Sequence, residues 1–121
     1  PSDTYYHVHK RPKEHQMAYF NIGRGFPKEL MDGHWCYVVK DLGYKMLIIP
    51  CTSIKKESSP VNPNFEKDLT VLDDHGMITH SRMQLTDLRT VDIQRLDCRK
   101  PFYNVCDDQE EIRKFIIEHL F

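Results

Sequence analysis

The stretch HWCYVVKDLGYKMLIIPCT, residues 34–52, decides the fold. It contains two runs rich in β-branched and aromatic residues, 34–41 and 44–52, which are typical of strands. The short link DLG (41–43) joins them, so the two runs are predicted to form a hairpin. In the second run, MLII (46–49) is continuously apolar, which predicts a strand covered on both faces at the centre of a small barrel or sandwich.

The flanking sequence predicts further strands on both sides of the hairpin. HQMAYFNI (15–22) is compact and aromatic and stops at a pair of glycines, which predicts a strand that runs into a loop. DLTVLDDHGMITHS (68–81) predicts a strand, a turn and a strand, and MQLTDLRTVDIQRLD (83–97) predicts two more short strands around residues 88–90. Before them, IKKESSPVNPNFEK (54–67) is mostly polar and predicts a long surface loop.

The pattern becomes helical near the end of the chain. An aspartate at position 107 or 108 can cap a helix, and the apolar residues that follow recur at helical spacing: Ile112, Phe115, Ile116 and Leu120. We therefore predict a helix over 108–120. Short strands followed by one terminal helix predict a mainly β fold, a small barrel of the SH3-like type. Residues 15–121 are predicted to form one domain, and residues 1–14 a loosely held arm or an added edge strand.

The composition limits the classes of function. Hydrophobic residues make up 40% and charged residues 29% of the 121 residues, which is typical of a globular domain and argues against disorder or a coiled coil. The longest apolar run, 46–51, is far shorter than the roughly 20 residues that cross a bilayer. The formal net charge of −1 gives no overall attraction to nucleic acid. RNA binding would therefore depend on a local basic patch, hydrogen bonds or stacking.

The cysteines and histidines give only a weak signal for a metal site, and an unrelated metal-binding barrel that uses the N-terminal histidines is the least favoured alternative. The four cysteines form no CxxC pair, and three of them lie among apolar or aromatic residues, as small buried thiols do. A cytoplasmic protein is favoured. His7 and His9 would share one face of a strand, with His15 nearby, but no acidic or cysteine ligand completes the set. We expect neither a metal nor another cofactor.

Two segments in combination resemble the paired signature of the MazF/PemK family of toxin ribonucleases: IIPCTS (48–53) and DLRTVDIQRLD (87–97). In that family one strand ends in a Thr-Ser or Thr-Ala step, and a later strand pair carries Arg-Thr-Val/Ile-Asp and then Arg-Leu before a C-terminal helix. YFNIGRGFPKELMDGHWCYVV (19–39) is similar to the family's first strand, its Gly- and Glu-containing loop and the next strand. The resemblance covers residues 17–121.

The resemblance implies the barrel of plasmid-maintenance toxins such as MazF, Kid and CcdB. It also implies a metal-independent endoribonuclease that cuts single-stranded RNA, mRNA included, as the toxin of a toxin–antitoxin pair. The expected partners are a second copy, forming a homodimer, and a cognate antitoxin whose disordered segment covers the RNA groove. Two departures bear on the chemistry. His34 stands where typical members have the arginine assigned to catalysis, and Thr86 where they have an acidic residue. A barrel that has lost cleavage and binds RNA or a protein therefore stays an alternative.

The implied reaction specifies the residue types of the catalytic site. Attack by a ribose 2′-hydroxyl needs a base, an acid and groups that stabilise a phosphorane, and histidine titrates near neutral pH. We predict that Thr52 and Ser53 hold the phosphate and that His34, across the strand pair, acts as acid or base. In the competing interpretation Thr52 and Ser53 only end a strand, and His34 is a surface or core hydrogen-bonding residue.

Further residues are predicted to bind RNA: Arg24, Glu29, His80, Arg82, Gln84 and Arg89. Arg24 and Glu29 lie in the loop that borders the RNA groove in relatives, although charged loop residues are often only solvated. Strand alternation sends residues 80, 82 and 84 to one face, which could line a groove or simply face solvent. Arg89 belongs to the family string, where a salt bridge is as natural a role as catalysis.

Overall fold

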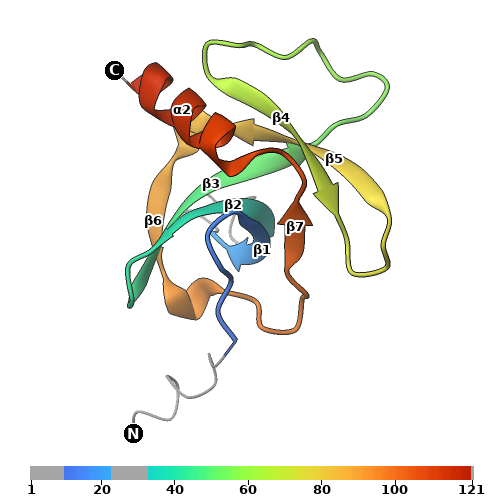
Figure 1. The fold of residues 1–121 in the computed structure, drawn as a ribbon. Coiled ribbons are helices and arrows are strands. Elements are labelled where there is room, and N and C mark those ends of the chain that lie inside the picture. Colours follow the sequence, from blue (N-terminus) through green and yellow to red (C-terminus); the bar gives the residue numbers. More distant parts are fainter. Residues whose placement is uncertain (1–9, 23–32, 121) are drawn as a thin grey trace, which may run out of the picture.

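The computed structural model describes residues 10–22 and 33–120, and these form seven strands and a C-terminal helix (Figure 1). In chain order the elements are β1 (Gln16–Asn21), β2 (Gly33–Asp41), β3 (Lys45–Ser53), β4 (Glu66–Leu72), β5 (Ile78–Gln84), the 3₁₀ turn η2 (Leu85–Asp87), β6 (Arg89–Asp92), the 3₁₀ turn η3 (Ile93–Arg95), β7 (Tyr103–Val105) and α2 (Gln109–Leu120).

The predicted hairpin is formed by β2 and β3. Val38 pairs with Ile48, and the register shifts between Val38 and Lys40, so the hairpin contains an irregularity that increases local twist. Gly43 has φ +94°, a conformation that glycine adopts without steric cost. Arg11 donates hydrogen bonds of 2.9 and 2.7 Å to the Asp41 carboxylate at the hairpin end. The segment before β1 is therefore fastened to the hairpin.

The strands close into a six-stranded antiparallel barrel. The order β2-β1-β7-β4-β5-β3 returns to β2 through the β2–β3 pairing, and β6 adds to the free part of the β3 edge. β7 pairs on one side with β1 and on the other with β4, so it joins the first strand to the middle of the chain. The predicted small β-barrel with a terminal helix is confirmed.

The barrel interior holds the first of two apolar clusters. Its residues come from all six barrel strands, from η2 and from the helix: Met17, Tyr37, Ile49, Cys51, Leu69, Val71, Met83, Leu85, Val105, Ile112 and Ile116. Because Ile112 and Ile116 belong to it, α2 covers one end of the barrel (Figure 1). The backbone N–H of Glu111 donates to the Asp108 carboxylate at 3.2 Å, which caps the helix as predicted.

The second apolar cluster lies outside the barrel. It joins the outer faces of β1, β2 and β3 to the segment that begins with β6: Ala18, Phe20, Ile22, Cys36, Val38, Met46, Ile48, Val91, Ile93 and Leu96. β3 therefore contributes Ile49 to the interior and Ile48 to the outer cluster. The prediction that MLII is covered on both faces is confirmed.

Several local predictions need correction. Residues 83–97 contain the last two residues of β5, the turn η2, the strand β6 and the turn η3 rather than two further strands. The long loop ends before Glu66, where β4 begins. β7 was not predicted, because three residues are too few to show a period. Two cysteines are buried and two exposed, whereas three looked buried in the sequence. Of the predicted arm, residues 10–14 are described, and Pro12 in this part is fully buried.

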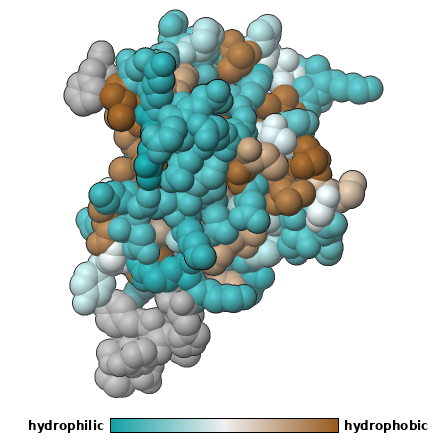
Figure 2. Space-filling view, in the orientation of Figure 1, coloured by the Kyte–Doolittle hydropathy of each residue, from teal (hydrophilic) through white to brown (hydrophobic). Residues whose placement is uncertain are grey.

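The surface carries scattered apolar side chains. On the face drawn in Figure 2, hydrophobic residues gather in separate patches with hydrophilic areas between them. The large apolar residues that are exposed come from two hairpin ends, the β3–β4 loop and the outer side of α2: Leu42, Tyr44, Val61, Met77, Ile78, Ile117 and Leu120. Among the described residues, no helix combines the length and the apolar composition that spanning a bilayer requires.

Candidate functional site

A band of polar residues lies on the outer side of the barrel, where β3, β5 and β4 run beside one another. Thr52 of β3 pairs with Arg82 of β5, and Arg82 pairs with Asp68 of β4. Paired residues of neighbouring strands project from the same face of a sheet. Side chains alternate along β3, and Ile48 belongs to the outer cluster, so Thr52 also projects outward. We call Thr52, Arg82 and Asp68 the polar band.

His34 lies at the end of this band. The β2–β3 pairing ends at Cys36 and Pro50. His34 lies two residues before Cys36 on β2 and Thr52 two residues after Pro50 on β3, so both lie just beyond the last pair of the hairpin. His34 is half-buried and Thr52 is exposed. Cys36 belongs to the outer cluster, so alternation places His34 on the outer face as well. Two of the three predicted catalytic residues therefore project from the same outer face, just beyond the end of the β2–β3 pairing.

Arg89 contributes positive charge to the same region. It pairs with Ile48 at the start of β6, two residues along β3 from Pro50. Burial raises the pKa of the Cys36 thiol well above its usual value, Cys51 raises it further, and the positive charge of Arg89 opposes the rise. Since Cys36 lies two residues from His34 on β2, the Arg89 guanidinium acts within this part of the outer face.

Ser53 does not share the face of Thr52. It is the next residue along β3, so its side chain projects to the opposite side of the sheet, and it pairs with Ser81 of β5. Its backbone groups remain beside Thr52, but the two hydroxyls cannot point the same way from a regular strand. The predicted triplet thus reduces to a pair of side chains with an adjacent backbone.

Arg82 is held by the protein itself. Its Nε and Nη2 donate to Asp68 at 2.7 and 3.3 Å, and its Nη1 donates to the carbonyl oxygen of Ser59 at 2.6 Å. The residue is 9% exposed. Three of the five N–H donors of the guanidinium are used in this way. Arg82 therefore fixes the β3–β4 loop against the polar band.

Gln84 takes part in a second anchor of that loop. Its amide donates to Glu66 at 3.0 Å, and the other carboxylate oxygen of Glu66 accepts from the backbone N–H of Asn62 at 2.7 Å. This backbone hydrogen bond is the main reason that the pKa of Glu66 is lowered. The sequence analysis did not identify Asp68 and Glu66 as site residues. In the structure Asp68 pairs with Arg82, and Glu66 pairs with Gln84.

The other predicted RNA-binding residues have different settings. His80 is exposed and pairs with Thr70, and its carbonyl oxygen accepts from the N–H of Ile54 at 3.3 Å. Its side chain lies on the outer face of β5, two residues from Arg82, which is the residue that pairs with Thr52. Arg24 and Glu29 lie outside the described residues, so their predicted role stays a prediction.

Three aromatic rings form a ladder on the face of β1 and β2 that is opposite to the face of His34. The rings of Tyr19 and Trp35 meet edge to face with centroids 5.3 Å apart, and Trp35 stacks on Tyr103 at 4.2 Å. The ammonium group of Lys100 lies 4.8 Å from the centre of the Tyr19 ring. Tyr37 is the next residue of β2 on this face, but it is 2% exposed and its hydroxyl bonds to His15 at 2.9 Å.

The site offers proton-transfer and phosphate-binding groups. Burial raises the pKa of Cys51 to about 12, so this thiol is not a nucleophile at neutral pH. Residues 10–22 and 33–120 contain no group of three or more histidine, cysteine or acidic side chains arranged to hold a metal ion.

No protein-family model matches the chain, and no curated protein matches it either.

Proposed function

We propose that the protein is a metal-independent endoribonuclease that cleaves single-stranded RNA as the toxin of a toxin–antitoxin pair, working as a homodimer. The observation that carries this proposal is that His34 and Thr52 project from one outer face just beyond the last β2–β3 pair, and that the charge of Arg89 acts on Cys36, two residues from His34. The resemblance of residues 17–121 to MazF/PemK toxins supports the same function.

The proposed reaction divides the work among these three residues. His34 takes the proton of a ribose 2′-hydroxyl, whose oxygen then forms a bond to the adjacent phosphorus. Thr52 donates a hydrogen bond to the phosphate, and the charge of Arg89 stabilises the phosphorane. The bond from phosphorus to the 5′ oxygen breaks, and the leaving oxygen takes a proton from water at this exposed face. The products are a 2′,3′-cyclic phosphate and a 5′-hydroxyl.

The test incubates the purified protein with a long single-stranded RNA in excess EDTA and maps the fragment ends. Wild type should give discrete fragments with cyclic-phosphate ends. His34→Ala should lower the rate about 10²–10⁴-fold, which is the usual contribution of a general base. Thr52→Val removes the hydroxyl at nearly constant volume and should also slow cleavage.

His75→Ala is the matched control, because His75 is an exposed histidine in the turn between β4 and β5. It should cleave like wild type. Intact RNA at high concentrations of folded wild-type protein would overturn the enzymatic proposal. Retained binding of RNA in that case would instead support the alternative of a barrel that binds RNA without cutting it.

A further inference from the structure

A positively charged surface lies beside the candidate site. It consists of Lys10, Arg95, Arg99 and Lys100, which we call the basic surface. These side chains line two open depressions of about 360 Å³ each, and the two depressions share Cys98 and Arg99. With the acidic residues of the same walls, Asp74 and Asp97, the lining carries a net charge of +2, whereas the whole chain carries −1.

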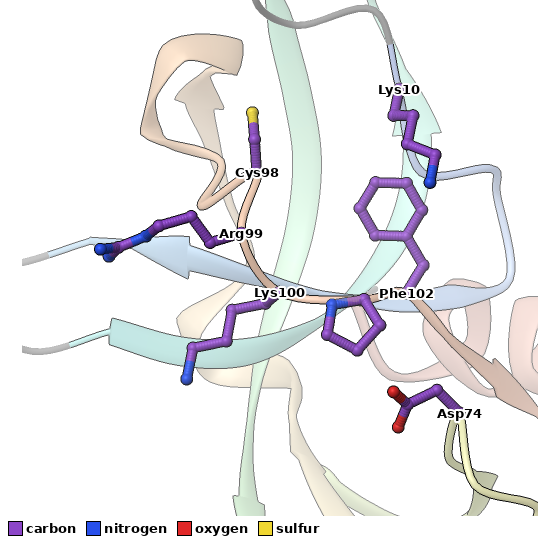
Figure 3. A pocket seen from close by; sticks show the side chains of 7 residues that line it. Lys10, Asp74, Cys98, Arg99, Lys100 and Phe102 are labelled. Carbon is purple, nitrogen blue, oxygen red and sulfur yellow. The ribbon is translucent and has the colours of Figure 1, made fainter.

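A tight turn over residues 97–100 presents two of these cations, Arg99 and Lys100, to solvent. The Asp97 carboxylate accepts from the N–H of Arg99 at 3.0 Å, and the N–H of Lys100 donates to the carbonyl oxygen of Asp97 at 3.2 Å. Figure 3 shows Cys98, Arg99 and Lys100 fanning out from this turn, with Lys10 beside Phe102 across the depression. The turn thus presents consecutive side chains that point in different directions around the two depressions.

The cations retain donors for a ligand. Arg99 uses Nε and Nη2 on Asp97, and its side chain is 90% exposed, so this solvated ion pair contributes little and a phosphate can compete for the guanidinium. Arg95 donates through Nη1 to the carbonyl oxygen of Asn21 at 3.5 Å, which leaves most of its five N–H groups. Within the part of the chain that the structure describes, Lys10, Arg95 and Lys100 form no ion pair, and the ammonium group of Lys100 lies 4.8 Å from the centre of the Tyr19 ring.

The Arg95 end of the basic surface is close to His34, with one strand, β1, between them. Phe20 pairs with His34 on one side and forms an isolated bridge with Leu96 on the other. Two strand spacings separate His34 from Leu96, which is about 10 Å. Arg95 precedes Leu96 directly. A nucleic-acid strand with one phosphate at His34 can therefore bring neighbouring phosphates over Arg95.

We propose that the basic surface binds the phosphates of the RNA strand on one side of the cleavage position. The inference rests on the proposed function and adds the direction in which the strand leaves the catalytic residues. It also resolves the mismatch between an RNA substrate and an acidic chain, since the positive charge is concentrated where the strand passes.

The first test measures the salt dependence of binding. A labelled RNA with 2′-O-methyl riboses lacks the nucleophile, so it binds without being cut. The dissociation constant is measured over a series of KCl concentrations for wild type and for Arg95→Gln/Lys100→Gln. Each lost phosphate contact lowers the slope of log K against log salt by about 0.7 for a single strand, so the double variant should lose about 1.4.

The matched control is Lys40→Gln/Lys114→Gln, which removes the same charge from exposed positions on β2 and α2. Its slope should equal that of wild type. An unchanged slope in Arg95→Gln/Lys100→Gln, with cleavage by wild type intact, would overturn the basic surface alone. Absence of both binding and cleavage by wild type would overturn the proposed function together with it.

The second test uses cysteines already in the chain. Cys98 lies in both depressions, and Cys106 is an exposed thiol after β7, beside the start of α2. The 2′-O-methyl RNA should slow alkylation of Cys98 by iodoacetamide several-fold and leave Cys106 unchanged, as measured by peptide mass spectrometry. Equal rates at Cys98 with and without bound RNA would contradict the proposal. Equal protection by inorganic phosphate at the same phosphate concentration would reveal an isolated anion site and overturn it too.

Discussion

Replacing Ile112 by alanine should remove much of the attachment of α2 to the barrel. Ile112 is 0% exposed and belongs to the interior cluster. The change deletes three carbon atoms, each contributing about 0.8 kcal/mol when buried, and leaves a cavity, so the expected loss is about 3 kcal/mol. The higher helix propensity of alanine returns only about 0.4 kcal/mol. For a domain of this length the melting temperature should fall by about 10 °C.

The same helix supplies the matched control. Ile117 is 62% exposed, so Ile117→Ala makes the same chemical change with little loss of burial and should alter stability by about 0.5 kcal/mol or less. Both variants and wild type are compared by urea unfolding followed by circular dichroism. Equal losses at the two positions would refute the reasoning, because they would mean that α2 does not close the barrel through Ile112.

Three further predictions follow from local contacts. The Arg11 hydrogen bonds hold the pKa of Asp41 below its usual value, so the stability lost in Asp41→Asn should be constant above about pH 5 and decrease as acid protonates the wild-type carboxylate; a loss that does not decrease at all on acidification would contradict this. A Cβ at Gly33 would lie 2.2 Å from the Tyr19 ring, so Gly33→Ala should shift the emission of Trp35, and an unchanged spectrum would count against the ring ladder. Ellman's reagent at pH 8 should react quickly with the two exposed thiols and with the two buried ones only after unfolding; four equal rates would exclude the burial described.

The sequence predicts those parts of the fold that have a long periodic signal. The β2–β3 hairpin and α2 were predicted nearly to the residue, since each combines an apolar pattern with a recognisable turn or cap. β7 has only three residues and no turn signal, so its place between β1 and β4 arises from tertiary pairing alone.

The candidate site was predictable to a smaller extent. Strand alternation correctly grouped residues 82 and 84, but the sequence could not show that Asp68 and Glu66 occupy their donors. Those partners come from β4, whose register with β5 depends on the whole barrel. The basic surface was missed for a related reason: Lys10 lies far along the chain from residues 95–100, and only the fold brings them to the same depression.

The position of β7 has a consequence for the order in which the protein can assemble during synthesis. β1 leaves the ribosome early, yet one of its edges has no complete partner until Tyr103–Val105 has emerged, because β7 connects it to β4. His15 adds a second late contact, since its Nε2 lies 2.7 Å from the carbonyl oxygen of Asp107. The barrel of a nascent chain therefore cannot close until Tyr103–Val105 has left the ribosome, and the outer face that carries His34 and Thr52 reaches its final geometry only after that point.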